Sequence, residues 1–88
     1  MNNFFLLLFL SLTHINPVLS QSNLLERVKN NPGDAIQMCN KFKDLNSKGV
    51  SASSDKAIEF VSKKNNLSPV NAEIFSIYVI GLHCPQVI

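Results

Sequence analysis

A chain of 88 residues has room for one domain, because domains typically span roughly 100–200 residues. Its eight Lys and Arg side chains stand against six Asp and Glu side chains. The resulting net charge of +2 is too small for a dedicated nucleic-acid binder. The length also excludes a dinucleotide-binding fold, a closed barrel and a multidomain enzyme.

The charged side chains divide the chain into two parts. All of them lie in residues 21–88, whereas residues 1–20 contain none. Residues 4–10 form an unbroken apolar run. Such a run is too short for a membrane-spanning helix, which needs about 20 residues, but it fits the apolar region of a secretory signal, which has about 7–15. We therefore predict that residues 1–20 are a signal peptide and that residues 21–88 form a single small helical domain.

The end of the apolar segment is typical of a cleavage site. Pro17 breaks any helix, and Val18 and Ser20 stand at the −3 and −1 positions of a cut before Gln21. Two alternatives stay open: an uncleaved signal that tethers a small protein to the membrane, and a buried amino-terminal helix of a cytosolic protein. The favoured interpretation predicts a secreted or periplasmic protein.

Cys39 and Cys84 are the only cysteines, so an exported chain has one possible intramolecular disulfide. Exported proteins meet oxidising conditions, and small exported domains use disulfides because their cores are small. A Cys39–Cys84 bond would close a loop of about 46 residues, which the chain-entropy treatment values at roughly 4 kcal/mol. A domain of this size has about 5 kcal/mol of stability in total. The disulfide would therefore decide whether the mature chain is folded.

Short helices are expected along the rest of the chain. A first helix should be capped at residues 22–23 and stop at residues 30–33, where Asn-Asn-Pro-Gly is a strong turn signal. A second helix should begin at Asp34, with Gln37 at the capping-box spacing, and should end before Gly49. Helical spacing places its apolar residues on one face, which consists of Ala35, Met38, Cys39, Phe42 and Leu45.

The third and fourth helices have clearer starts. Ser53 or Ser54 should cap the third helix, which ends at residues 65–66. Ser68 is the predicted N-cap of the fourth helix, with Pro69 at its first helical position. The buried stripe of the third helix should consist of Ala57, Ile58, Phe60 and Val61.

The fourth helix is apolar nearly all round over residues 74–82, so we expect most of it to be buried between its neighbours. Its many β-branched residues make a strand over residues 74–80 the competing interpretation, but the N-cap, the length and the lack of alternation favour a helix. Gly81 should either allow a close helix approach or end the helix early. Together these patterns predict an all-α fold, a small bundle of three or four short helices with one disulfide.

One group of residues suggests chemistry beyond folding. If the two cysteines meet, Met38, Cys39, His83 and Cys84 would bring together a thioether, two thiolates and an imidazole, a donor set that suits copper or zinc. The sequence lacks the paired C-x-x-C or H-x-x-x-H spacing of a structural zinc site. We therefore favour a disulfide, with Met38 in the core and His83 in a last helical turn. A soft-metal site stays as the alternative, and otherwise we expect no cofactor.

Signals for catalysis are missing from the sequence. A cysteine nucleophile needs a free thiolate beside a base, and no Gly-x-Ser-x-Gly elbow or phosphate-binding glycine loop is present. Glu59 and Glu73 carry no pairing signal for a two-carboxylate mechanism, and the lysines alternate with acids as on an ordinary solvated surface. We therefore predict that the protein is not an enzyme.

Four short stretches carry a resemblance to known proteins. They are CNKF at residues 39–42, LNSKGV at 45–50, LSPVNAE at 67–73 and YVIGLHCP at 78–85. Together with the Asn-rich, signal-bearing start, they resemble uncharacterised small exported two-cysteine helical proteins of marine cyanobacteria. The Gly, Leu-Ser and terminal Cys-Pro layout is also similar to that of small secreted mycobacterial proteins of unknown function. This resemblance implies a secreted, helical, disulfide-linked fold and no catalytic residue.

These observations predict a non-catalytic binding or envelope-associated module. We expect its partner to be a protein or a component of the cell envelope, and we expect it to bind no nucleic acid. Contact with a membrane would follow only from an uncleaved signal. The sequence does not identify the partner or the oligomeric state.

Overall fold

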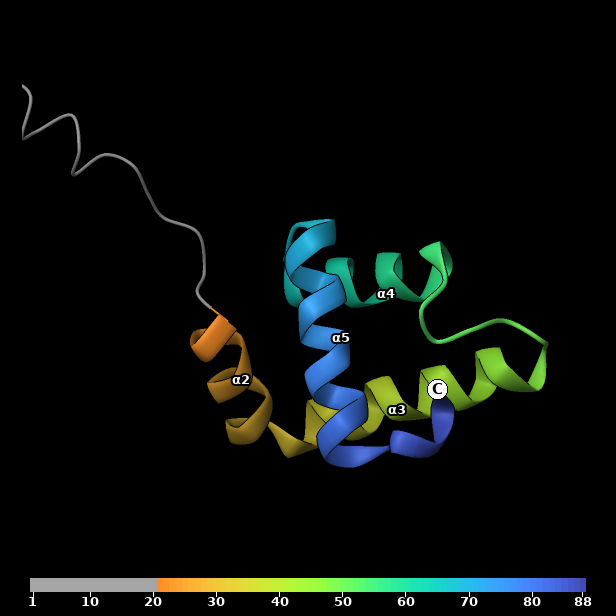
Figure 1. Cartoon of the computed structure of the whole chain (residues 1–88), viewed down its shortest axis with the longest axis horizontal. Coiled ribbons are helices and arrows are strands. Elements are labelled where there is room, and N and C mark those ends of the chain that lie inside the picture. The colour runs from red at the N-terminus through yellow and green to blue at the C-terminus, as the bar shows by residue number, and fades with distance from the viewer. Residues whose placement is uncertain (1–20) are drawn as a thin grey trace, which may run out of the picture.

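The computed structural model describes residues 21–88, which form four α-helices and one short 3-10 helix (Figure 1). In chain order they are α2 (Gln21–Asn30), α3 (Pro32–Ser47), α4 (Asp55–Asn65), α5 (Pro69–His83) and η1 (Pro85–Val87). Residues 21–88 contain no β-strand, so the predicted all-α fold is confirmed and the competing strand over residues 74–80 is wrong. The predicted signal peptide lies outside the described residues. None of the helices α2 to α5 is long and apolar enough to cross a membrane.

The central element of the bundle is α5. It packs against α2, α3, α4 and η1. Figure 1 shows α4 crossing near the start of α5, α3 crossing near its end, and α2 lying along its side. The predicted small bundle of short helices is confirmed. Because α5 contacts every other helix, its apolar residues contribute to the interface with each of them.

The core is built from the apolar faces that helical spacing predicts. On α3 the buried residues are Ala35, Met38, Cys39, Phe42 and Leu45. On α4, Ala57 and Val61 are buried, whereas Ile58 and Phe60 are only half-buried. Leu24 and Val28 supply the buried face of α2. The predicted stripe of α4 is therefore only partly buried, and Ile58 keeps part of its surface in solvent.

The connection between α2 and α3 is shorter than the sequence predicts. Asn31 alone separates the two helices, and its carbonyl accepts the first hydrogen bond of α3 at 3.1 Å, while its side-chain Nδ2 donates to the carbonyl of Arg27 at 2.8 Å. Pro32 opens α3, because a residue without an N–H loses nothing in the first turn. The predicted start at Asp34 is wrong, since Asp34 lies within the first turn. The predicted caps at residues 22–23 are also wrong, because both residues lie within α2.

The starts of α4 and α5 follow the prediction. The Oγ of Ser54 accepts a hydrogen bond from the backbone N–H of Ala57, and the Oγ of Ser68 accepts one from the backbone N–H of Asn71, both at 3.2 Å. Each bond satisfies a backbone donor that the first helical turn leaves free. Asn66 ends α4 in the left-handed conformation, at φ 53°.

The exposure of α5 departs from the expected burial. The buried residues of α5 are Ala72, Phe75, Ser76, Val79 and Ile80. However, Val70, Ile77 and Leu82 are 68%, 62% and 52% exposed. The three remaining helices cover only part of its circumference. Gly81 lies inside the helix, and no atom lies within 4 Å of the place where a Cβ would stand. The two roles predicted for this glycine are therefore wrong.

The predicted disulfide forms between the middle of α3 and the C-cap of α5. The sulfur atoms of Cys39 and Cys84 are 2.01 Å apart, and their Cα atoms are 6.0 Å apart. Both residues are buried. A second tie lies nearby, since the Nδ2 of Asn46 donates to the carbonyl of Val87 at 2.8 Å. The carboxyl-terminal segment is therefore fastened to α3 at two points.

Candidate binding groove

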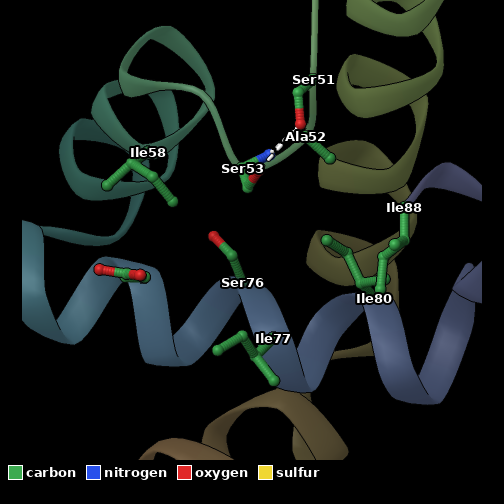
Figure 2. Close-up of a pocket in the computed structure, with 9 residues that line it drawn as sticks. Ser51, Ala52, Ser53, Ile58, Ser76, Ile77, Ile80 and Ile88 are labelled. Atoms are coloured by element: carbon green, nitrogen blue, oxygen red, sulfur yellow. Dashed lines mark hydrogen bonds between the residues drawn. The ribbon is translucent and has the colours of Figure 1, made fainter.

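A hollow of about 210 Å³ opens between α4, α5 and the connector that precedes α4. We call it the Ser76 hollow. Figure 2 shows Ser76 reaching from α5 toward Ser53, with Ile58 on one side and Ile80 and Ile88 on the other. Its apolar lining comes from Ala52, Ile58, Ile77, Ile80 and Ile88, and its polar lining from Ser51, Ser53, Glu73 and Ser76. The hollow therefore offers hydrocarbon walls and a few polar groups, as small binding sites do.

The connector sequence explains why space is left at this point. Ser51 accepts a hydrogen bond from the backbone N–H of Ser53 at 3.0 Å, and their hydroxyl oxygens are 2.9 Å apart. These bonds hold a tight turn, a role to which short serine side chains are well suited. Ala52, which lies between them, is buried. Three small side chains in a row leave the opposite wall, on α5, uncovered.

Ser76 is the one buried polar residue among the residues whose burial the structure describes. Its Oγ donates to the carbonyl of Ala72 one helical turn earlier, at 2.9 Å. The hydroxyl is thus satisfied within its own helix and still lines the hollow. It keeps acceptor capacity for a bound group, because a hydroxyl can accept as well as donate.

A second hollow of about 270 Å³ lies beside the first. We call it the Pro69 hollow. Its lining consists of Asp55, Ile58, Glu59, Ser62, Lys63 and Pro69. Ile58 lines both hollows. We refer to the two hollows together as the α4–α5 groove.

The groove follows one ridge of α5. Pro69, Glu73, Ile77 and Ile80 contribute to its lining at steps of four, four and three residues, the spacing of neighbours along one side of a helix. From the first to the last of these residues the helix rises about 16 Å, at 1.5 Å per residue. The groove therefore has the length of about three helical turns.

The charges in the groove are mainly negative. Asp55, Glu59 and Glu73 supply three carboxylates and Lys63 one ammonium group, so the groove has a net charge of −2. Since the whole chain has a net charge of +2, the remaining side chains carry +4. Half of the six acidic side chains therefore line the groove, against one of the eight basic side chains.

Only one of the groove carboxylates is neutralised. The Oε1 of Glu59 lies 2.7 Å from the Nζ of Lys63, and the hydrogen bond and charge of Lys63 lower the pKa of Glu59. The same contact raises the pKa of Lys63. Asp55 and Glu73 form no ion pair within residues 21–88. Two exposed carboxylates along the groove therefore have no ion-pair partner in the described part of the chain.

Several basic side chains away from the groove have structural roles. The guanidinium of Arg27 lies 5.3 Å from the ring centre of Phe75, and the Nζ of Lys41 lies 5.4 Å from that of Phe60. Lys64 donates to the Oε1 of Gln37 at 2.7 Å, which joins α4 to α3. These contacts join helices that are distant in sequence, and sequence spacing gives no sign of them.

The residues proposed for a soft-metal site do not form a ligand set in the oxidised protein. The sulfurs of Cys39 and Cys84 are bonded to each other. Met38 is buried, and its sulfur accepts a hydrogen bond from the Nδ2 of Asn65 at 3.4 Å. His83 is exposed in the last turn of α5. Within residues 21–88, no group of three or more His, Cys, Asp or Glu side chains is placed to hold a metal ion.

The groove is not predicted by any pattern in the sequence. The sequence patterns predict Glu59 and Glu73 to be separate surface acids, whereas in the structure they line adjoining hollows. One feature of the sequence does indicate an uncovered helix surface. A helix that is apolar nearly all round follows a connector of very small residues, so a bundle this short cannot cover the whole helix.

Fold and disulfide define a class, the small α-helical proteins fastened by a single disulfide. Within that class the chain belongs to the family DUF8664, which is described as a domain of unknown function and which matches residues 25–84. The matched segment runs from α2 to Cys84 and includes both cysteines. No curated protein and no solved structure shows significant similarity to the chain.

Proposed function

We propose that the protein is an exported, non-catalytic binding module whose binding surface is the α4–α5 groove. The observation that carries the binding role is that two isoleucine side chains lining this groove are left in solvent. Ile77 and Ile88 line the Ser76 hollow while 62% and 94% exposed, although the core beneath is sealed. Exposed aliphatic residues that gather around a hollow are a common feature of interaction sites.

Export is supported by two independent features. One is the uncharged, apolar character of residues 1–20. The other is the buried disulfide, since structural disulfides persist in oxidising compartments and are rare in the cytosol. The resemblance to small exported two-cysteine proteins belongs to the same proposal. The proposed location is the periplasm or the extracellular medium.

The non-catalytic role is supported by the hydroxyl groups of the groove. Ser76 bonds to the carbonyl of Ala72, and Ser51 bonds to Ser53. A nucleophilic serine needs a base within hydrogen-bond reach. The groove carboxylates are instead paired with Lys63 or exposed to solvent. The groove therefore suits recognition better than bond cleavage.

Export is tested by the intact mass of the protein in the periplasmic or culture fraction, with and without reductant. We expect loss of the amino-terminal segment and a gain of two hydrogens on reduction. Recovery of the full-length chain from the cytosol with both thiols reduced would refute export.

Binding is tested by site-specific photo-crosslinking in the same fraction. A photoreactive residue at Ile77 should give a discrete adduct, because Ile77 lines the groove. Ile36 is the matched control, since it is also an exposed isoleucine but lies on α3. Equal labelling from the two positions would refute a binding role for the groove.

A further inference from the structure

The two hollows, their length and their charge together restrict what the groove can bind. We propose that the α4–α5 groove binds a cationic amphipathic helix, with aliphatic side chains in the two hollows and Lys or Arg side chains beside Asp55 and Glu73. This inference rests on the proposed binding function and specifies the chemistry of its partner.

The shape of the groove favours a helix over a compact ligand. Two hollows of about 210 and 270 Å³ lie beside each other and share Ile58. Each is smaller than a typical site for a drug-sized ligand, which spans about 300–1,000 Å³. A helix places side chains at i, i+3, i+4 and i+7 on one face and can fill several hollows at once. The ridge from Pro69 to Ile80 matches about three turns of such a helix.

The charge of the groove selects among helical partners. Its net charge is −2, and Asp55 and Glu73 lack ion-pair partners within the described part of the chain. Complementary charge beside an apolar anchor gives an interface its specificity and its fast association. A partner with Lys or Arg flanking its apolar face would supply that complement. An acidic helix would place like charges together.

The same charges argue against a second copy and against an anionic membrane. A symmetric dimer through the groove would bring the same patch of both copies together. Two surfaces of net charge −2 would then face each other. An anionic lipid surface would meet the same carboxylates. A basic amphipathic partner is the occupant that satisfies both the aliphatic hollows and the two acids without ion-pair partners.

The test uses two designed helical peptides of 18 residues with identical leucine faces. The polar face carries lysine in one peptide and glutamate in the other. Binding to the exported protein is measured by fluorescence anisotropy at low and high salt, and the site is located by NMR of the isoleucine methyl groups. We expect the lysine peptide to bind at least tenfold more tightly than the glutamate peptide and to weaken with salt. The shifted methyl signals should belong to Ile58, Ile77, Ile80 and Ile88.

Matched variants separate the groove from general charge effects. Glu73→Lys should lower the affinity for the lysine peptide about tenfold. Asp34→Lys should change its affinity less than twofold, because Asp34 is an equally unpaired acid on α3, outside the groove. Ile77→Ser should also weaken binding about tenfold, whereas Ile36→Ser should leave it unchanged. Circular dichroism spectra and melting curves of all four variants establish that each is folded.

Several outcomes would overturn the inference. Equal affinity for the two peptides, or equal effects of Glu73→Lys and Asp34→Lys, would show that the groove charge does not select the partner. Methyl shifts outside the groove would show that the peptide binds elsewhere. A dimer that Ile77→Ser dissociates, or binding to anionic vesicles that Ile77→Ser abolishes, would show a different occupant. A specific photo-crosslink at Ile77 without lysine-peptide binding would refute the cationic partner and leave the proposed binding function in place. Absence of both the photo-crosslink and lysine-peptide binding would refute the cationic partner and the proposed binding function together.

Discussion

The two sides of α5 meet the rest of the molecule in different ways. On one side Phe75 and Val79 are buried and Cys84 is bonded to α3. On the other side Ile77 is mostly exposed and Glu73 has no ion-pair partner among the described residues. One helix of 15 residues, together with its C-cap Cys84, therefore supplies both the disulfide attachment to α3 and an uncovered apolar surface. In a bundle this small, burial depends on the number of neighbouring helices and not on apolar character alone.

Removal of the disulfide, which lies on the buried side of this comparison, should have the largest effect on stability. The double variant Cys39→Ala/Cys84→Ala should lose about 4 kcal/mol of stability, because the unfolded chain regains the freedom of a loop of about 46 residues. A domain of this size has little more than that in total. Thermal unfolding by circular dichroism under non-reducing conditions measures the loss. Equal melting temperatures for variant and parent would contradict the stabilising role of the bond.

Truncation of one side chain on each side of α5 tests the contrast directly. Phe75→Ala should lose about 3 kcal/mol, because it leaves a cavity in the core and removes the ring beneath Arg27. Ile77→Ala should change stability by less than about 0.5 kcal/mol, because this side chain is already largely in solvent. Urea unfolding of both variants gives the two values. Losses of similar size would show that the two sides of α5 are equally buried.

Two glycines should respond to alanine with opposite signs. Gly81→Ala should stabilise the protein by up to about 1 kcal/mol, because Gly81 lies in a helix with open space around it. Gly49→Ala should destabilise it by about 1 kcal/mol, because Gly49 has a φ of +78° after α3. Chemical denaturation of the pair measures both signs. Destabilisation by Gly81→Ala would indicate that this surface of α5 is covered.

The smallest expected effect concerns the ion pair within the groove. Lys63→Ala should raise the pKa of Glu59 toward its ordinary value of 4.5, because Lys63 is the group that lowers it. Since the folded-state pKa of Glu59 is lowered, the pair stabilises the fold above pH 4.5 and loses this contribution as the pH falls through the lowered pKa. Carboxyl carbon NMR during a pH titration measures the change. Lys29→Ala is the control and should leave the titration of Glu59 unchanged.

Much of the fold was predictable because its signals are local. A serine followed by a helix-forming run fixed the starts of α4 and α5, since the cap bond spans only three residues. The apolar face of α3 followed from helical spacing. The start of α3 was misplaced by two residues because Asn-Pro-Gly reads as a turn, whereas Pro32 serves in the first helical turn. The cysteine pairing needed no geometry, since only two cysteines exist.

The groove was not predictable from the same signals. Ile77 and Val79 are both β-branched and only two positions apart, yet one is largely exposed and the other fully buried. Nothing in their local sequence separates them, because exposure depends on which sides of α5 the other helices cover. Glu59 and Glu73 belong to different helices, and only the crossing of α4 and α5 places them along one groove.

The sequence alone determined the features that depend on a few neighbouring residues: helix rather than strand, most helix ends and the buried face of α3. It also determined the only possible disulfide, because the chain has two cysteines. Tertiary structure decided which apolar residues stay in solvent and which charges share a surface. The physical reason is that caps and helical periodicity act over one or two turns. Burial and charge grouping depend instead on the relative placement of helices that are far apart in the chain.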